Sequence, residues 1–366
     1  MKFDPLNRWS SGAEKPLIIA GPCSAETEDQ LLETTKAIKE LDISIIRAGI
    51  WKPRTRPNNF EGIGLEGLKW IQNVKKELGV SFAVEVATPQ HVEQVLKHDI
   101  DILWIGARST VNPFTVQDIA DALKGVDIPV LIKNPINPDL ELWLGAIERI
   151  YNAGITKIGA IHRGFSSHQK SKYRNMPAWQ LPIELKRRLP NLPMICDPSH
   201  IAGDSKMIYD LCQKALDMDY DGLMIETHRD PANAWSDAKQ QVNPLQLHEI
   251  LQKLKVRKSN SNDETFNSRL EDIRHQIDQA DREILECLAN RMSLVKKIGD
   301  CKKEENVAVF QVDRWNDIFK SRAEWGESFG LDPKYITELY KIIHNESIRR
   351  QTDLMNNPTV PTDNVA

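Results

Sequence analysis

Six cationic residues in the first half of the chain stand at or just after the ends of short apolar runs: Arg47, Lys52, Arg54, Arg108, Lys133 and Arg163. For any one of them, a solvated surface pair is the ordinary explanation. Gathering all six at one place would cost on the order of several kcal/mol of repulsion unless anions bound among them. Arginine captures phosphate or carboxylate bidentately and lysine acts as a point charge, so the set predicts a site for phosphorylated small acids or sugars.

A thiol, an imidazole and two carboxylates follow other apolar runs, namely Cys23, His200, Glu226 and Asp237. Together they form a borderline ligand field that suits a divalent Mn, Fe, Co or Zn ion. Such an ion would act as a Lewis acid on a carbonyl oxygen. Taken singly, Cys23 is more simply explained as a buried core residue and His200 as the partner in a loop hydrogen bond.

The apolar runs alternate with longer stretches of helical period, which is typical of βα units and a parallel sheet. We expect strands near residues 17–20, 44–48, 82–86, 102–105, 130–133, 157–161, 194–197 and 222–226. We expect helices near residues 28–41, 65–78, 89–98, 115–124, 140–152, 179–189, 206–218 and 244–254. Eight βα units over roughly 240 residues match an α/β fold of the TIM (β/α)8 barrel type, whose usual length is about 250 residues. A doubly wound open sheet is the alternative, but no GxGxxG follows the first strand.

The expected barrel would bring the charged residues together. In a TIM barrel the active site lies on the loops that follow the carboxyl ends of the strands. Nearly every expected strand ends beside one of the residues above, and Glu85 stands at the end of the third strand. We therefore expect these side chains to converge on a single rim.

The chain changes character at residues 256–265, which are polar and are typical of a linker. From 266 to 304, apolar residues recur at spacings of three, four and seven without proline, which predicts one long amphipathic helix. Shorter helices are expected at 311–325 and 332–354, and three helices make so thin a core that we expect a dimer. The predicted domains are a barrel over 1–255, a linker over 256–265, a small all-α domain over 266–355 and a disordered tail over 356–366.

Two cations interrupt the apolar stripe of the long helix. Arg291 and Lys302 are eleven residues apart, which places them within roughly 20° of one another around the helix. Burying unpaired cations on such a face is costly, so either a ligand supplies carboxylates or the long stems reach out to water. Ser347 and Gln351 likewise put polar groups on the apolar face of the third helix. Two helices that break their pattern together suggest a pocket.

The composition, with 40% apolar and 27% charged residues, is that of a soluble globular protein. The longest apolar runs are far shorter than the roughly 20 residues of a membrane span. A formal net charge of −4 gives no general attraction to nucleic acid or anionic lipid. The five cysteines are odd in number and lack CxxC spacing, so we expect no disulfide framework and a reducing cytoplasm.

Several short sequence motifs at the strand ends carry a family resemblance. The most diagnostic motif is KPRT, which begins at Lys52. It is supported by GPCS, GAR, IKN, HRG, DPSH and ETH. From Asp4 to Leu254 the chain resembles 3-deoxy-D-arabino-heptulosonate 7-phosphate (DAHP) synthase, and the short run before the first strand resembles the short type I subfamily. The resemblance implies condensation of phosphoenolpyruvate with erythrose 4-phosphate, with release of phosphate.

The resemblance also implies a role for each charged residue. A divalent metal ion, with Mn²⁺ expected before Fe²⁺, Co²⁺ or Zn²⁺, would be held by Cys23, His200, Glu226 and Asp237. Phosphoenolpyruvate would be surrounded by Arg47, Lys52, Arg108, Lys133 and Arg163. The aldose phosphate would be taken by Arg54 and Thr55. Lys52 would help to activate the aldehyde, and Glu85 would position the water that attacks later.

The nearest alternative is the related 3-deoxy-D-manno-octulosonate 8-phosphate synthase. That family has the same barrel and the same first substrate but takes a five-carbon aldose phosphate. Its pattern carries an Asn-Arg-Ser type segment where this chain has Pro53-Arg54-Thr55, so the sequence favours DAHP synthase. A departure from the expected pattern follows His200, where residues 201–204 replace a Gly-rich continuation.

The helical domain resembles the all-helical chorismate mutase from about Ser268 to Gln351. The match rests on spaced residues, which are Arg274, Arg291, Lys302, Arg314, Ser347 and Gln351. It implies a homodimer in which the long helices pair and Arg274 reaches the partner's pocket. Arg291, Lys302 and Gln351 would be the catalytic groups. Cations would hold the two carboxylates of chorismate in a compact conformer and stabilise charge on the breaking ether oxygen.

Two positions depart from the mutase pattern. Gln311 stands where a carboxylate that contacts the substrate is expected, and Trp315 stands where a Glu that binds the substrate hydroxyl is expected. The alternative is therefore a non-catalytic module that senses chorismate or prephenate and regulates the barrel. The sequence predicts a bifunctional DAHP synthase and chorismate mutase of aromatic amino acid biosynthesis.

Overall fold

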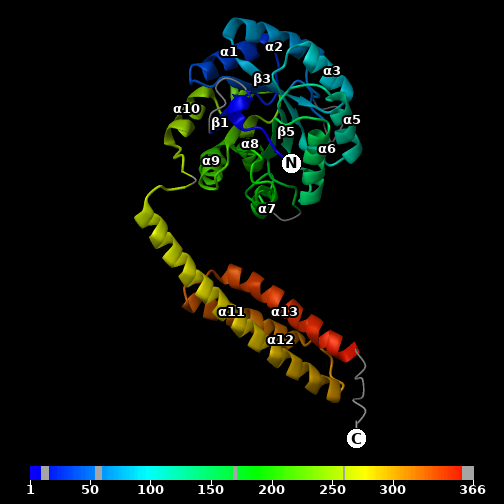
Figure 1. Ribbon diagram of the computed structural model, residues 1–366, viewed down its shortest axis with the longest axis vertical. Helices are drawn as coiled ribbons and strands as arrows, with labels where there is room; N and C mark the ends of the chain where they lie inside the picture. The colour runs from blue at the N-terminus through cyan, green and yellow to red at the C-terminus, as the bar shows by residue number, and fades with distance from the viewer. Residues whose placement is uncertain (10–15, 54–59, 168–170, 259, 357–366) are drawn as a thin grey trace. The chain divides into compact units, whose positions relative to one another are not determined.

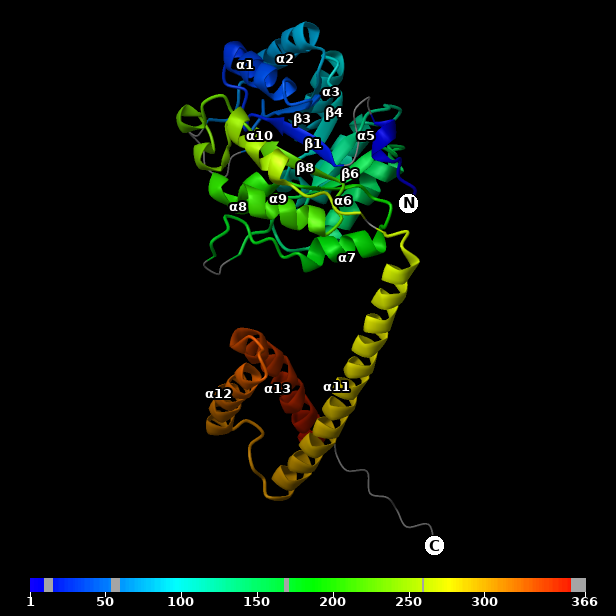
Figure 2. The same cartoon turned by 90° about the vertical axis from the view of Figure 1, so that its left-hand side faces the viewer.

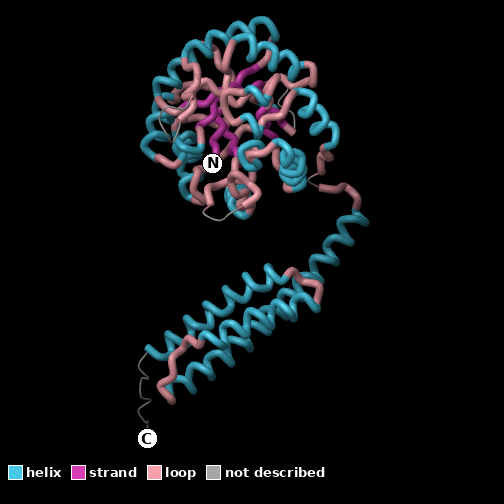
Figure 3. Tube along the Cα trace, turned by 180° about the vertical axis from the view of Figure 1, so that it is seen from behind, coloured by secondary structure: helices cyan, strands magenta, loops and turns pink. Residues whose placement is uncertain are grey.

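The structure is a computed structural model that describes residues 1–9, 16–53, 60–167, 171–258 and 260–356. The chain divides into two compact units, Met1–Ser259 and Asn260–Ala366. Figure 3 shows that the strands are confined to the first unit, whereas the second is built from helices and their connecting loops.

Eight parallel strands close into a barrel in chain order. They are β1 (Leu17–Gly21), β2 (Ile45–Ala48), β3 (Ser81–Val86), β4 (Ile102–Ile105), β5 (Val130–Lys133), β6 (Ile158–His162), β7 (Met194–Cys196) and β8 (Gly222–Glu226). The barrel closes where β1 pairs with β8, from Leu17 opposite Gly222 to Gly21 opposite Glu226. The expected TIM barrel is confirmed, and each expected strand matches an observed one to within one residue at either end.

Helices surround the strands of this unit (Figure 1). The longer ones are α1 (Glu28–Lys39), α2 (Leu65–Leu78), α3 (Pro89–Lys97), α5 (Pro113–Ala122), α6 (Leu140–Asn152), α7 (Gln180–Arg188), α9 (Ile208–Asp217) and α10 (Pro244–Lys253). The side chains of Thr88, Asn112 and Asp139 cap the first turns of α3, α5 and α6 by accepting hydrogen bonds from backbone amides. Such caps fix where the helices begin.

Short helical segments were not predicted from the sequence. They are α4 (Ala107–Thr110), α8 (Pro198–Ala202) and the 3-10 turns Leu6–Arg8, Ser205–Met207, Pro231–Asn233 and Ala238–Gln240. Segments of one turn or so are too short to show a hydrophobic period, so pattern reading does not find them. Two of them, α4 and α8, directly follow strand ends and carry residues of the candidate site.

The strands are buried on both faces, as the strands of a closed parallel barrel must be. The barrel interior is filled by a cluster that includes Ile45, Trp104, Leu131 and Met224, and Trp9 belongs to the same cluster. The outer faces of the strands pack against the helices in a larger cluster. Because each strand is bonded on both sides and packed on both faces, the side chains at its carboxyl end are held firmly.

The second unit consists of α11 (Glu264–Glu304), α12 (Val312–Ser328) and α13 (Pro333–Asn356), which confirms the three expected helices. Helix α13 packs against both α11 and α12 (Figure 2). In α11 the buried residues Met292, Val295 and Gly299 all lie in the second half, whereas apolar residues of the first half, such as Ile277, are exposed. None of the described helices is long and apolar enough to cross a lipid bilayer.

We predict that the barrel core responds strongly to truncation at Ile147, which is fully buried on α6. Ile147→Ala should lower the free energy of unfolding of the barrel by roughly 2–5 kcal/mol, because a cavity replaces packed methyl groups. The matched change Glu148→Ala, at an exposed position of the same helix, should stay within about 0.5 kcal/mol. Denaturant unfolding of both variants is the measurement, and equal losses would contradict the packing described.

Candidate active sites

Buried charges meet at the carboxyl ends of the barrel strands. Arg47 on β2, Lys133 on β5 and Glu226 on β8 are 3%, 4% and 0% exposed. Arg47 Nη2 lies 3.1 Å from Glu226 Oε1, and Lys133 Nζ donates to Asp197 Oδ2 at 2.9 Å. The indole of Trp104 lies against both cations, with its ring centroid 5.1 Å from Arg47 Cζ and 5.7 Å from Lys133 Nζ. The structure thus brings these side chains to one rim.

The ion pair of Arg47 and Glu226 leaves hydrogen-bonding capacity unused. Arg47 Nε, Arg47 Nη1 and Glu226 Oε1 are buried and have no hydrogen-bond partner among the described residues. Burial alone would lower the pKa of Arg47, but the charge of Glu226 outweighs it and raises that pKa. Burial alone would raise the pKa of Glu226, but His200 and Arg47 outweigh it and lower that pKa. Both groups are therefore charged, and both can still bind a ligand.

Arg163, which follows β6, is another buried cation at this rim. It is 8% exposed, and its Nη1 donates to the carbonyl of Gly164 at 3.3 Å. Burial lowers the pKa of Arg163 to about 10; Asp197 opposes the shift, while the nearby cations Arg174 and Arg108 add to it. A carbonyl does not compensate the charge of a buried guanidinium, so an anion would stabilise this side chain.

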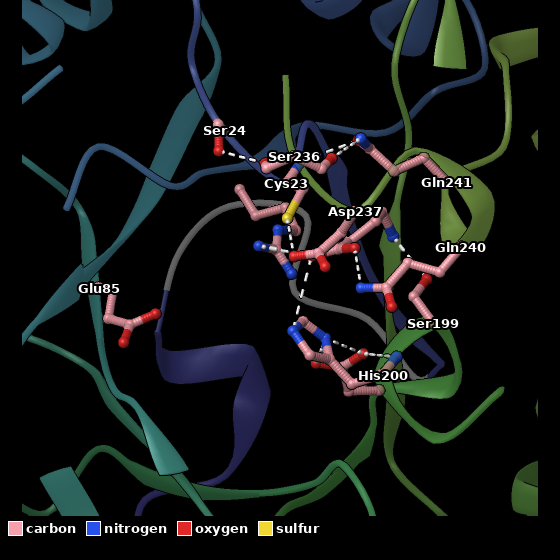
Figure 4. Close-up of polar contacts among 12 residues, drawn as sticks. Cys23, Ser24, Glu85, Ser199, His200, Ser236, Asp237, Gln240 and Gln241 are labelled. Carbon is pink, nitrogen blue, oxygen red and sulfur yellow. Dashed lines mark hydrogen bonds and ion pairs between the residues drawn. The ribbon is translucent and has the colours of Figure 1, made fainter. Parts of the chain in front are cut away.

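The thiol after β1 lies between a cation and a carboxylate. Cys23 is 1% exposed, and Lys52 Nζ is 2.7 Å from its Sγ. The same Sγ lies 3.3 Å from Asp237 Oδ2, and Figure 4 marks this contact with a dashed line. Burial raises the pKa of Cys23 to about 12, and the charge of Glu226 adds to this effect. In this arrangement the sulfur is therefore a protonated thiol that a stronger positive charge would ionise.

His200 reaches the same place from α8. Its Nδ1 lies 2.8 Å from Asp197 Oδ2, which fixes the ring, and its Nε2 lies 3.8 Å from Glu226 Oε1. Burial lowers the pKa of His200 in spite of the opposing charge of Asp197. A neutral imidazole that is oriented through one nitrogen and leaves the other available is the form that metal-binding histidines take.

The four expected metal ligands therefore lie as two neighbouring pairs, Cys23 with Asp237 and His200 with Glu226. Among the described residues, no three His, Cys, Asp or Glu side chains are gathered closely enough to hold a metal ion as they stand. Glu226 Oε1 accepts no hydrogen bond from the described residues although it lies 3.1 Å from Arg47 Nη2, so this oxygen and the second nitrogen of His200 nevertheless suit a cation. The donor set also fits a borderline divalent ion, so these residues fit the expected group chemically.

Three residues to which the sequence assigned no role support this set. Asp197 anchors both His200 and Lys133, as described above. Arg174 Nη1 donates to Asp237 Oδ1 at 2.9 Å and to Gln240 Oε1 at 2.5 Å, and Gln240 Nε2 donates to Glu226 Oε2 at 2.6 Å. Asp197 stands at a strand end, so its position could have identified it. Arg174 and Gln240 lie on loops or short turns without any periodic signal.

The remaining barrel residues are placed differently. Trp104 Nε1 donates to Glu85 Oε2 at 2.9 Å, and Glu85 lies apart from the cluster around Cys23 (Figure 4). A Cβ atom at Gly106 would lie 2.1 Å from Glu85 Oε1, so a larger residue there would displace this carboxylate. Arg108 on α4 is exposed. The residues expected to bind the aldose phosphate lie outside the described residues, namely Arg54 and Thr55.

In the helical unit, polar side chains meet between α11 and α13. Arg291 Nη1 donates to Ser347 Oγ at 2.6 Å, and Lys302 Nζ donates to the carbonyl of Val309 at 2.7 Å. Ser347 and Gln351 are buried, and Gln351 Oε1 has no hydrogen-bond partner among the described residues. Burial lowers the pKa of both Arg291 and Lys302. The structure thus places these expected pocket residues on facing helices, where the two cations and Gln351 Oε1 remain available to bind a ligand.

The other residues expected in this pocket are exposed. Arg274 pairs with Glu271 on its own helix. Gln311 precedes the first turn of α12, and Arg314 lies within that turn, both in contact with solvent. The expected reach of Arg274 into a partner subunit stays a prediction.

The barrel with its charged rim, joined to a helical unit with a second set of cations, defines a TIM-barrel enzyme with an added helical domain. Residues 3–261 match the model of the DAHP synthetase I family, and residues 273–352 match that of chorismate mutase type II. The phospho-2-dehydro-3-deoxyheptonate aldolase of Thermotoga maritima is 32% identical over 238 residues, which are 65% of this chain and 68% of that protein. A crystal structure of that aldolase, also described as DAHP synthase, matches with a TM-score of 0.59 and 31% identity over 65% of this chain and 67% of the other.

Relatives of lower sequence identity have the name of the alternative enzyme, which takes a five-carbon aldose phosphate. The 2-dehydro-3-deoxyphosphooctonate aldolase of Legionella pneumophila is 27% identical over 267 residues, which are 68% of this chain and 94% of that protein. The family model and the more similar heptonate aldolase decide between the two possibilities. The chain belongs to the DAHP synthetase I family, and it carries a chorismate mutase domain in the same polypeptide.

We predict that Asp197→Asn destabilises the barrel by about 3–5 kcal/mol, because it leaves the buried Lys133 ammonium without its counter-charge and His200 without its anchor. The exposed carboxylate Asp118 on α5 provides the matched control, and Asp118→Asn should have almost no effect. Denaturant unfolding near pH 7 measures both. Equal stability of the two variants would show that Asp197 does not hold the rim together.

Proposed function

We propose that the barrel condenses phosphoenolpyruvate with erythrose 4-phosphate, that it needs a divalent metal ion, and that the helical domain converts chorismate to prephenate. The single observation that carries the barrel proposal is the group of buried and incompletely compensated cations at the rim, above all Arg47 and Arg163. Such charges are stabilised by a small polyanion. A phosphorylated carboxylic acid supplies that charge in a compact form.

The cations would bind phosphoenolpyruvate and orient its enol carbon. Lys133 and Arg163 offer a point charge and a fork of donors at neighbouring strand ends, and Arg47 adds two nitrogen atoms that make no hydrogen bond to a described residue. Arg108, although exposed, is near enough to Arg163 to lower its pKa and can close over the phosphate from α4. Arg54 and Thr55 are proposed to hold the phosphate of the aldose. Positioning two anions in one rim in this way supplies much of the catalytic advantage.

The aldehyde would be activated beside Cys23. A divalent ion held by Cys23, His200, Glu226 and Asp237 would supply Lewis acidity to the aldehyde oxygen, with Mn²⁺ as our first choice. Lys52, whose ammonium is 2.7 Å from Cys23 Sγ, would give a proton to that oxygen as the new carbon–carbon bond forms. Glu85 would hold the water that then adds to the cationic carbon, and would take its proton before phosphate leaves. Trp104 keeps the Glu85 carboxylate in place.

For the barrel we predict that phosphate release from phosphoenolpyruvate and erythrose 4-phosphate falls at least about 100-fold after chelation. Added Mn²⁺ should restore it in the unaltered protein but not in Cys23→Ala. Cys212→Ala, which changes a buried cysteine of α9, should behave like the unaltered protein. A colourimetric phosphate assay is the measurement.

The same assay separates the alternatives. Replacing erythrose 4-phosphate by arabinose 5-phosphate should lower the rate strongly if the barrel is a DAHP synthase. Full activity after chelation would refute the metal proposal, and a preference for the five-carbon sugar would refute the substrate proposal.

The mutase proposal rests on Arg291 and Lys302, whose pKa values are lowered by burial, and on the buried polar residues Ser347 and Gln351 of α13. Two carboxylates of chorismate would compensate these charges and be held close together for the rearrangement. Gln351 would assist at the breaking ether oxygen. We also propose a homodimer, because the first half of α11 exposes Phe266, Ile273 and Ile277 in the single chain. Arg274 from the same half is proposed to reach the partner's pocket.

We propose that the enzyme works in the cytoplasm. All five cysteines are free, including Cys287 and Cys301 at exposed positions, which supports a reducing compartment. The substrates proposed above are small charged metabolites.

For the helical domain we predict that Arg291→Ala lowers kcat/KM for chorismate by on the order of 10²–10³-fold, because it removes charge from the transition state. Arg349→Ala removes an exposed arginine that pairs with carboxylates of its own helix, so its rate should stay unchanged. Loss of chorismate absorbance measures both. Intact turnover in Arg291→Ala would exclude this pocket and favour a domain that only senses the ligand.

A further inference from the structure

A histidine without an assigned role lies at the candidate mutase pocket. His344 stands on α13 three residues before Ser347 and seven before Gln351, so the three share one face of the helix. Its ring meets the indole of Trp315 on α12, with centroids 4.3 Å apart and an interplanar angle of 76°. Trp315 is itself packed against Phe319, with centroids 4.6 Å apart. Aromatic packing therefore holds the imidazole in position.

One nitrogen of this imidazole is left without a partner. His344 Nδ1 is buried and has no hydrogen-bond partner among the described residues. Burial lowers the pKa of His344, and the charges of Arg291 and Lys302 lower it further. The ring is therefore neutral near pH 7, with one nitrogen that accepts a hydrogen bond and one that donates. A buried polar atom without a partner is unfavourable unless a ligand completes it.

The surroundings favour an acceptor at this nitrogen. The pKa of Arg291 is lowered by burial and by Arg322, with Tyr340 opposing, and that of Lys302 is lowered by burial. In the described part of the chain, no Asp or Glu side chain contributes to these shifts or to that of His344. Neighbouring cations disfavour a further positive charge, so the lone pair of a neutral ring is the stable state beside them.

Chorismate carries two carboxylates, one ether oxygen and one ring hydroxyl. If the pocket binds chorismate as proposed above, Arg291 and Lys302 match groups that accept hydrogen bonds. The hydroxyl is the substrate's only donor near pH 7, when both carboxylates are ionised, and it needs an acceptor. We infer that His344 Nδ1 accepts the hydrogen bond of this hydroxyl, which makes His344 a residue that determines substrate specificity.

Gln351 offers the competing acceptor. Its Oε1 is also buried without a partner, while its Nε2 donates to the carbonyl of Ser347 at 3.2 Å. The amide nitrogen carries a second N–H besides the one that bonds to Ser347, and this N–H suits the ether oxygen of the substrate. The imidazole of His344, by contrast, keeps a lone pair, because the charges of Arg291 and Lys302 disfavour a further proton on the ring. The two side chains therefore divide the work, with His344 on the hydroxyl and Gln351 on the ether oxygen.

The test compares chorismate with an analogue in which hydrogen replaces the ring hydroxyl, using the full chain. The unaltered protein should prefer chorismate by about tenfold or more in kcat/KM, which is the value of one well-placed hydrogen bond. His344→Leu should lower kcat/KM for chorismate by this factor and leave kcat/KM for the analogue unchanged, so that the preference disappears. Asn345→Ala, at the exposed neighbouring position, should keep the preference. His344→Phe serves for the same comparison if the leucine variant does not fold.

The inference would be overturned by equal losses on both compounds in His344→Leu, since a merely structural role acts on both. It would also be overturned if Gln351→Leu, and not His344→Leu, removed the preference. Failure of the pocket itself is distinguishable, because Arg291→Ala would then convert both compounds at the unaltered rate. If Arg291→Ala loses turnover of both compounds while His344→Leu keeps the preference for chorismate, only the role of His344 is wrong.

Discussion

Charge that the protein itself does not fully compensate is the constraint on which both sites depend. At the barrel rim, Arg47 and Glu226 are buried as an ion pair, yet within the described part of the chain Arg47 Nε and Nη1 donate no hydrogen bond and Glu226 Oε1 accepts none. Leaving such groups in contact with neither water nor a partner is unfavourable. The arrangement persists because a closed ladder of eight strands fixes the backbone beneath it. A polyanionic substrate and a divalent cation would complete it.

The two units meet this constraint by different means. In the barrel, Arg47, Lys133 and Glu226 come from separate strands, and their relative positions are set by strand pairing and by Trp104 beneath the cations. In the helical unit, Arg291 and Ser347 come from two helices whose packing alone sets their distance. The helical pocket therefore depends on side-chain packing, including that of Trp315, far more than the barrel rim does.

The sequence predicts the features that follow from hydrophobic periodicity and from a residue's position at the end of a strand. The eight strands were located because buried parallel strands are continuous apolar runs, and the rim cations because they follow those runs. The roles of Arg174 and Gln240 were not predictable, since they act through contacts between loops distant in sequence. The role of His344 is not predictable for a different reason, because one polar residue on an apolar helix face is ordinary, and only the structure shows that its Nδ1 has no hydrogen-bond partner among the described residues. Short helices such as α4 and α8 cannot be predicted from the sequence, because a single turn is too short to show a hydrophobic period.

Whether an anion and a metal ion complete the barrel rim can be tested with an anomalous difference map from crystals of the protein grown with Mn²⁺ and phosphoenolpyruvate. We predict a metal peak bounded by Cys23, His200, Glu226 and Asp237, and the substrate's phosphate and carboxylate in contact with Arg47, Lys133 and Arg163. A metal bound elsewhere, or phosphoenolpyruvate held away from these cations while they remain paired only with the protein, would contradict it.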